Sequence, residues 1–127
     1  MASRMERLKK LVAVQEQLKA LHETRRAGFL AEAAAAEREA EALAERFDAE
    51  GSLASLFPEL YHNRIAGALK RRDDKLDGAR GEAALVAAAT ARTNMVERSY
   101  RQARRDDERQ RGDRERLEII ERRRRAD

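Results

Sequence analysis

Few residues of this 127-residue chain have the types and spacing that catalysis or metal binding needs. The two histidines, His22 and His62, are forty positions apart and belong to no HExxH motif, so the sequence does not indicate a zinc or di-metal site. No GxGxxG run and no GxxxxGK run followed by Ser or Thr occurs, so no glycine-rich loop is predicted to bind nucleotide phosphates. The chain has no cysteine, which excludes thiol catalysis and disulfide bonds.

Adjacent carboxylates, which acid–base catalysis could use, occur at Asp73 and Asp74 and again at Asp106 and Asp107. Arginines flank both pairs, so on exposed helices we expect solvated ion pairs that each contribute under about 1 kcal/mol. Residues 78–81 match the GxxG pattern of a KH loop, but that loop needs surrounding strands and the sequence predicts none. We therefore expect a protein that is not an enzyme and that has no cofactor, metal or small-molecule substrate.

Arginine is most concentrated in residues 101–127, where eleven arginines accompany eight acidic residues. Arginines contact phosphates, which would suit a nucleic-acid-binding helix, but the interleaved acids repel nucleic acid. No aromatic residue beyond Tyr100 is placed to stack on bases. The cluster 122–125 also suits a helix C-terminus, where the helix dipole favours cations. Nucleic-acid binding is therefore a disfavoured alternative.

The composition predicts long helices. Ala, Glu, Lys, Leu and Arg supply 82 of the 127 residues, a bias typical of a coiled coil. Without the 25 alanines only 28 hydrophobic residues remain to fill a core, which excludes a thick globule. No segment is apolar enough for a signal peptide or a membrane span, so we expect a soluble or peripheral protein.

A first helix is predicted over about residues 3–50. Ser3 and Glu6 have the spacing of a capping box at its start. Inward-facing residues then recur at spacings of three and four in two runs, joined through Arg25 by a stutter. The two runs are Leu11, Val14, Leu18 and Leu21, and then Phe29, Ala33, Ala36, Ala40, Leu43 and Phe47.

Gly51, Ser52, Ser55 and Pro58 predict a chain break, so we place the turn at about 51–57 and a second helix at about 58–120. Its inward residues keep the three–four alternation across two glycines at 78 and 81, which favours one continuous helix over a break there. Beyond Ala103 the apolar pattern stops, and we expect that end to project as a solvated helix or to fray. The predicted inward residues are Ile65, Leu69, Arg72, Leu76, Ala79, Ala83, Val86, Thr90, Thr93, Glu97 and Tyr100.

The fold class that follows is all-α, a long antiparallel two-helix coiled-coil hairpin with a longer second helix. Residues 28–60 carry a net charge of −6, whereas residues 1–27, 61–100 and 101–127 carry +4, +3 and +3. A hairpin places both basic termini at one end and the acidic stretch near the turn. Because the seam is mostly alanine, it buries little area, and we expect the protein to rely on a partner for part of its order.

Five large apolar residues lie around the predicted turn, where a two-helix hairpin has little to cover them. One interpretation is that they pack into the hairpin's own cap, and the other is that they form an exposed patch that docks a partner. They are Leu53, Leu56, Phe57, Leu60 and Tyr61.

The helix from the N-terminus, the central turn, the longer second helix and the Arg/Gln/Glu-rich runs 101–105 and 108–111 resemble the FliJ/YscO family of flagellar and type III secretion export stalk proteins. The pattern Leu8-x-x-Leu11-x-x-Val14, followed by Gln15 and Gln17, is similar to the opening helix of that family. The resemblance covers nearly the whole chain.

The resemblance implies an antiparallel coiled coil that inserts into the export ATPase hexamer and links it to the export gate membrane protein and to export chaperones. It implies a cytoplasmic protein, peripheral at the inner face of the cell membrane, with a role in flagellum biogenesis and motility. The turn cluster would face the gate. The basic end would enter the ATPase ring through Arg4, Arg7, Lys9, Lys10, Arg122 and Arg123.

Two alternatives come from other classes of protein. One is a helical scaffold that homodimerises into a four-helix bundle through its alanine-rich seam, and the other is the arginine-rich nucleic-acid binder. The stalk interpretation predicts a monomer in isolation, whereas the scaffold predicts a dimer in sedimentation.

Overall fold

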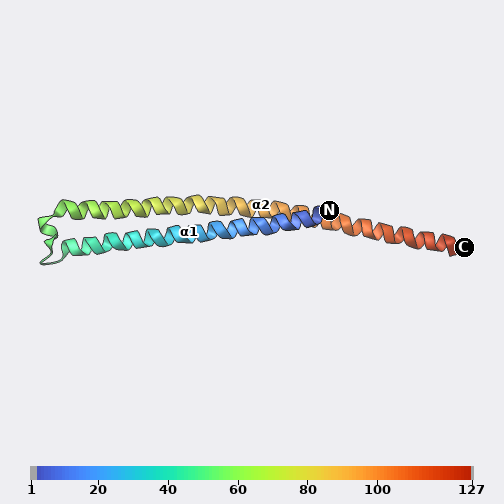
Figure 1. Ribbon diagram of the computed structural model, residues 1–127, viewed down its shortest axis with the longest axis horizontal. Coiled ribbons are helices and arrows are strands. Elements are labelled where there is room, and N and C mark those ends of the chain that lie inside the picture. Colours follow the sequence, from blue (N-terminus) through green and yellow to red (C-terminus); the bar gives the residue numbers. More distant parts are fainter. Residues whose placement is uncertain (1–2, 127) are drawn as a thin grey trace. The chain divides into compact units, whose positions relative to one another are not determined.

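The computed structural model describes residues 3–126, which form two α-helices joined by a short 3-10 helix (Figure 1). Helix α1 covers Arg4–Asp48, the 3-10 helix η1 covers Leu53–Leu56, and α2 covers Pro58–Ala126. No strand occurs among these residues, which confirms the all-α class, and two helices are what a helical hairpin requires.

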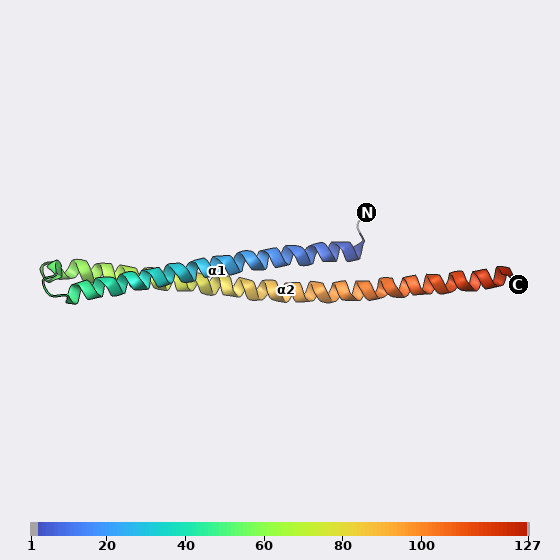
Figure 2. The same cartoon turned by 90° about the horizontal axis from the view of Figure 1, so that it is seen from below.

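The chain divides into two compact units, each of which contains a segment of α1 and a segment of α2. We call residues 19–88 the turn unit, and residues 3–18 with 89–126 the terminal unit. Both lie on the same two continuous helices, which Figure 2 shows from a second direction.

Helix α1 begins with the predicted capping box. The Ser3 hydroxyl accepts a hydrogen bond from the Glu6 backbone N–H at 3.2 Å, and the Glu6 carboxylate accepts one from the Ser3 N–H at 3.4 Å. These bonds satisfy two backbone donors that a helix start otherwise leaves unpaired.

The chain break lies where Gly51 and Pro58 predict it. Gly51 has a φ of +72°, a left-handed conformation that a side chain would disfavour. The Ser52 hydroxyl accepts a hydrogen bond from the Ala54 N–H at 3.1 Å and so caps η1. Pro58 then opens α2, where its missing N–H costs nothing.

Helix α2 passes through Gly78 and Gly81 without interruption and continues to Ala126, six residues beyond the end expected near 120. Ion pairs between successive turns support its C-terminal part, because side chains three or four positions apart are neighbours on a helix. Arg111 contacts Asp107 at 2.5 Å, and this hydrogen bond raises the pKa of the Arg111 guanidinium above its usual value.

The two glycines inside α2 differ in their surroundings. A Cβ atom at Gly78 would lie 2.9 Å from the ring of Phe29, whereas a Cβ at Gly81 would meet nothing within 4 Å. The absence of a side chain at 78 therefore lets the Phe29 ring lie directly against α2.

This difference predicts unequal effects of two alanine substitutions on stability. Gly81→Ala should raise the free energy of unfolding by about 1 kcal/mol, because alanine is the better helix former. Gly78→Ala should gain less than Gly81→Ala or lose stability, because its methyl group must displace the Phe29 ring. Urea unfolding followed by circular dichroism measures both, and equal gains at the two positions would contradict the close approach of Phe29.

The core of the turn unit consists almost entirely of alanine. Its buried residues on α1 match the predicted seam, and no large side chain among the described residues is fully buried. Small side chains permit two helices to approach closely but bury little apolar area. The buried residues are Ala33, Ala36, Ala40, Leu43, Ala54, Ala68 and Ala79.

The predicted seam of the first half of α1 is wrong. Leu11, Val14, Leu18 and Leu21 are exposed, whereas the residues turned inward are half-buried. The half-buried and buried residues keep the three–four spacing on both sides of the exposed Arg26, so α1 needs no stutter. The half-buried residues are Met5, Leu8, Val12, Gln15, Lys19, His22 and Phe29.

Candidate partner-binding surfaces

Four of the five predicted turn residues form an exposed apolar patch. The fractional exposure of the four is between 49 and 69%, so the cap of the helix pair does not bury them. We call these four the turn patch: Leu53, Leu56, Phe57 and Leu60.

Tyr61, the fifth predicted residue, is half-buried and has a different role. Its ring lies 6.3 Å from the Phe47 ring, and Phe47 lies 5.0 Å from the ring of His62. These three aromatic groups join the end of α1 to the start of α2, and Ala54 is fully buried. The exposed turn patch therefore lies next to residues that are packed between the two helices.

Three carboxylates lie close to the turn patch in the sequence. Asp48, Glu50 and Glu59 lie within the turn or one helical turn of it, and they take part in none of the ion pairs that the described residues form. An apolar surface with an acidic border attracts partners of positive charge.

Farther along the turn unit, cross-helix ion pairs connect α1 and α2. Glu39 contacts Arg71 at 2.9 Å, and Glu32 contacts Lys75 at 2.8 Å, while Lys75 also lies over the Phe29 ring. Along these pairs, the residue number on α2 falls as the residue number on α1 rises. Exposed pairs such as these contribute under about 1 kcal/mol each, so they fix the register more than the stability.

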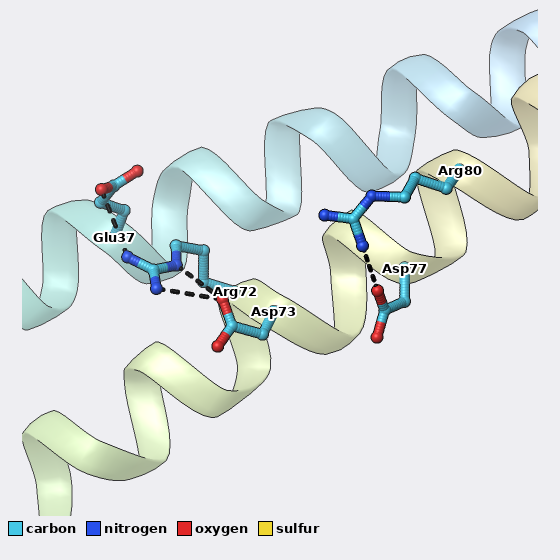
Figure 3. Close-up of polar contacts among 5 residues, drawn as sticks. All are labelled: Glu37, Arg72, Asp73, Asp77 and Arg80. Atoms are coloured by element: carbon cyan, nitrogen blue, oxygen red, sulfur yellow. Dashed lines mark hydrogen bonds and ion pairs between the residues drawn. The ribbon is translucent and has the colours of Figure 1, made fainter.

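Arg72 extends this series by bridging two carboxylates, as Figure 3 shows. Its guanidinium contacts Asp73 at 3.0 Å and Glu37 at 3.5 Å. The hydrogen bond with Asp73 raises the pKa of Arg72 above its usual value, with a smaller contribution from Glu37. Figure 3 also shows Asp77 paired with Arg80, one turn along α2.

Three of the four adjacent carboxylates considered as acid–base candidates thus lie in ordinary polar contacts. Asp73 binds Arg72, Asp107 binds Arg111, and Asp106 accepts a hydrogen bond from Gln102 at 3.1 Å.

None of the polar contacts between the helices was predicted from the sequence, and the least exposed of those described here joins His22 to Glu82. His22 Nδ1 lies 2.6 Å from the Glu82 carboxylate, and their side chains are only 17% and 12% exposed. His22 continues the three–four spacing of the inward residues, which is the signal that could have placed it there. Among residues 3–126 no group of three histidines or carboxylates could hold a metal ion.

The predicted basic end separates into two clusters within the terminal unit. Arg4, Arg7, Lys9 and Lys10 are exposed on the first turns of α1. Residues 3–5 line a surface hollow together with residues from 103 to 110 of α2. Arg122 and Arg123 are exposed twelve or more positions beyond that contact, about 18 Å along the helix. The structure therefore does not bring these two arginines to the start of α1.

None of the helices in the described part of the chain is long and apolar enough to cross a membrane. Comparison of the chain with family models, curated proteins and solved structures finds no match.

Proposed function

We propose that this chain is a non-enzymatic coiled-coil stalk or escort protein of flagellar or related type III export, and that it binds the export ATPase ring and the export gate. The resemblance to the FliJ/YscO family supports the choice of system. In this proposal α1 and α2 form an antiparallel coiled coil whose second helix is the longer, and the protein works in the cytoplasm at the inner face of the membrane.

The order of the cross-helix contacts supports the antiparallel coiled coil. Residues 22, 32 and 39 of α1 contact residues 82, 75 and 71 of α2 in that order. The inward residues of α1 also follow the heptad spacing that coiled coils use.

The observation that carries the proposal is the turn patch. Soluble monomers rarely expose contiguous large apolar side chains without a binding role. The aromatic contacts of Phe47 with Tyr61 and His62 hold the base of the patch in place, so a partner meets a preformed surface. We assign this surface to the export gate.

The basic start of α1 is assigned to the ATPase ring. Its cations Arg4, Arg7, Lys9 and Lys10 are exposed, as a docking site needs. Arg122 and Arg123 would make a separate contact farther along α2, and export chaperones would be further partners.

The ion pairs of the terminal unit make nucleic-acid binding the weaker assignment. Arg101 contacts Glu97 at 3.7 Å, Arg104 contacts Glu108 at 3.4 Å, and Arg116 contacts Asp113 at 3.8 Å. Carboxylates beside the arginines lower their gain from phosphate contacts.

The test of the proposed function is binding of the gate's cytoplasmic domain by a double variant, Leu56→Ala with Phe57→Ala. Both side chains are exposed, so the variant should keep its helicity and lose at least tenfold in affinity, because large apolar residues dominate interface energies. Isothermal titration calorimetry measures the affinity.

The matched control is Leu85→Ala, an exposed leucine of the same unit that lies away from the turn. It should bind the gate domain within about twofold of the unaltered chain. The assignment of the turn patch to the gate would be wrong if the unaltered chain did not bind the gate domain, or if the double variant bound it with unchanged affinity.

A further inference from the structure

The terminal unit exposes a second set of large apolar residues that the turn patch does not include. Leu11, Val14 and Leu18 of α1 and Met95 of α2 are between 39 and 65% exposed. On α1 their spacing is three and four, so they form one stripe along the helix. We call these four residues the lateral face.

The four side chains of the lateral face lie on one side of the terminal unit. Leu11 and Leu18 directly precede inward positions of α1, and Met95 directly precedes the half-buried Val96 of α2. In an antiparallel helix pair, the residue before an inward residue points to the same side on both helices.

A surface hollow supports this placement. Arg4 occupies the same heptad position as Leu11, and it lines the hollow together with Asp106 of α2. Asp106 follows Met95 by eleven positions, about three turns, and so shares its side of α2.

The border of the lateral face is cationic. Arg4 and Arg7 continue the stripe of Leu11 toward the helix start, and Arg92 lies one turn before Met95 on α2. All three guanidinium groups are on exposed residues, so they are available to a partner.

Most carboxylates of these helix segments form other polar contacts or lie on another side of the helix. Glu6 completes the capping box, Glu97 pairs with Arg101, and Glu16 lies two positions from both Val14 and Leu18, on another side of α1. Asp106 is the exception on this side, and its carboxylate accepts a hydrogen bond from Gln102. The lateral face therefore combines an apolar stripe with excess positive charge.

We propose that the lateral face binds an acidic amphipathic helix of a partner protein. The apolar side of that helix would pack on Leu11, Val14, Leu18 and Met95, and its carboxylates would reach Arg4, Arg7 and Arg92. This inference rests on the proposed function for the use of the basic end as a docking site, and it adds the chemistry of the partner there.

Two other occupants fit the face less well. Pairing with the same face of a second copy would bring six arginines into one interface that contains two Asp106 carboxylates, and like charges at close range repel. An anionic lipid surface favours protruding aromatic residues, and the lateral face has none. The three–four stripe instead matches the pattern by which one helix packs on another.

The experiment uses the full chain and a fluorescein-labelled synthetic peptide of 21 residues, with leucine at heptad a and d positions and glutamate at the flanking positions. Fluorescence anisotropy should show binding. The double variant Leu11→Ser with Leu18→Ser should weaken that binding at least tenfold, and Arg4→Gln with Arg7→Gln should weaken it and reduce its dependence on salt.

The matched control replaces two equally large exposed residues of the same unit, Leu117→Ser with Ile120→Ser, which lie outside the lateral face. Binding by this control should stay within about twofold, and circular dichroism should show unchanged helicity in all three variants.

Several outcomes would overturn the inference. They are equal binding of a peptide with lysine in place of glutamate, equal losses in the control variant, dimerisation of the chain that is lost in Leu11→Ser with Leu18→Ser, and binding to vesicles of anionic lipid without binding to the peptide. None of these results bears on the gate experiment, because the turn patch is intact in every variant used.

Discussion

Replacing Leu43 by alanine is expected to lower the free energy of unfolding by about 2–3 kcal/mol, toward the lower end of the range for buried leucines. Leu43 is 7% exposed and is the one apolar side chain larger than alanine that is buried among the described residues. A two-helix core of this size supplies only about 3–5 kcal/mol in total, so the loss should leave a substantial unfolded fraction at 25 °C.

Urea unfolding monitored by circular dichroism at 222 nm measures this loss. Leu30→Ala is the matched control, because Leu30 lies on the same helix and is exposed. Both substitutions introduce the same helix propensity, so their difference isolates the burial of Leu43. Equal stabilities of the two variants would show that Leu43 is not part of the core.

Replacing Ala68 by leucine is expected to cost about 1–3 kcal/mol, although leucine is nearly as good a helix former as alanine. Ala68 is completely buried, and the helices approach closely enough there that a larger side chain must push them apart. The loss in the free energy of unfolding therefore measures how closely the helices pack at Ala68.

Ala66→Leu is the control for Ala68→Leu, because Ala66 is exposed two positions earlier on α2. It should leave the unfolding midpoint nearly unchanged. If Ala68→Leu instead stabilised the protein, the space beside Ala68 would be larger than the structure shows, and an alanine-mediated close approach would be wrong.

The start of α1 and the break between the two helices could be predicted because local chemistry determines them. Ser3 with Glu6 starts α1, Gly51 adopts a positive φ after α1, and Pro58 starts α2. Each of these signals works within four or five residues, so it does not depend on how the helices pack.

The side of α1 that faces inward could not be predicted in its first half. Hydrophobicity alone favours the stripe that contains Leu11 and Leu18, but the inward side includes Gln15 and Lys19. The inward residues keep the same three–four spacing as the buried alanines farther along α1, although they are less hydrophobic than the stripe beside them. Contact with the other helix selects that side. The pattern of a single helix does not contain that constraint, which depends on the partner helix.

The candidate surfaces were predicted in part for a similar reason. The turn patch follows from the lack of neighbours around Leu53 and Leu56. Tyr61 is covered by Phe47, a contact between residues on different helices that sequence spacing does not reveal. The His22–Glu82 contact joins positions sixty apart in the chain. The lateral face could not be predicted, because its position depends on which side of α1 faces inward.

The alanine core also determines how the helix pair opens. Outside the layer that contains Leu43, the alanine layers contribute small and similar free energies, so none of them must break before the others, as in repeat proteins. Amide hydrogens should then exchange with solvent along a gradient, slowest among the buried alanines of residues 33–43 and faster toward the helix starts and ends. A helix bound along one side would slow exchange first at the turns it covers, and the distance over which that protection spreads would measure the cooperativity of the pair.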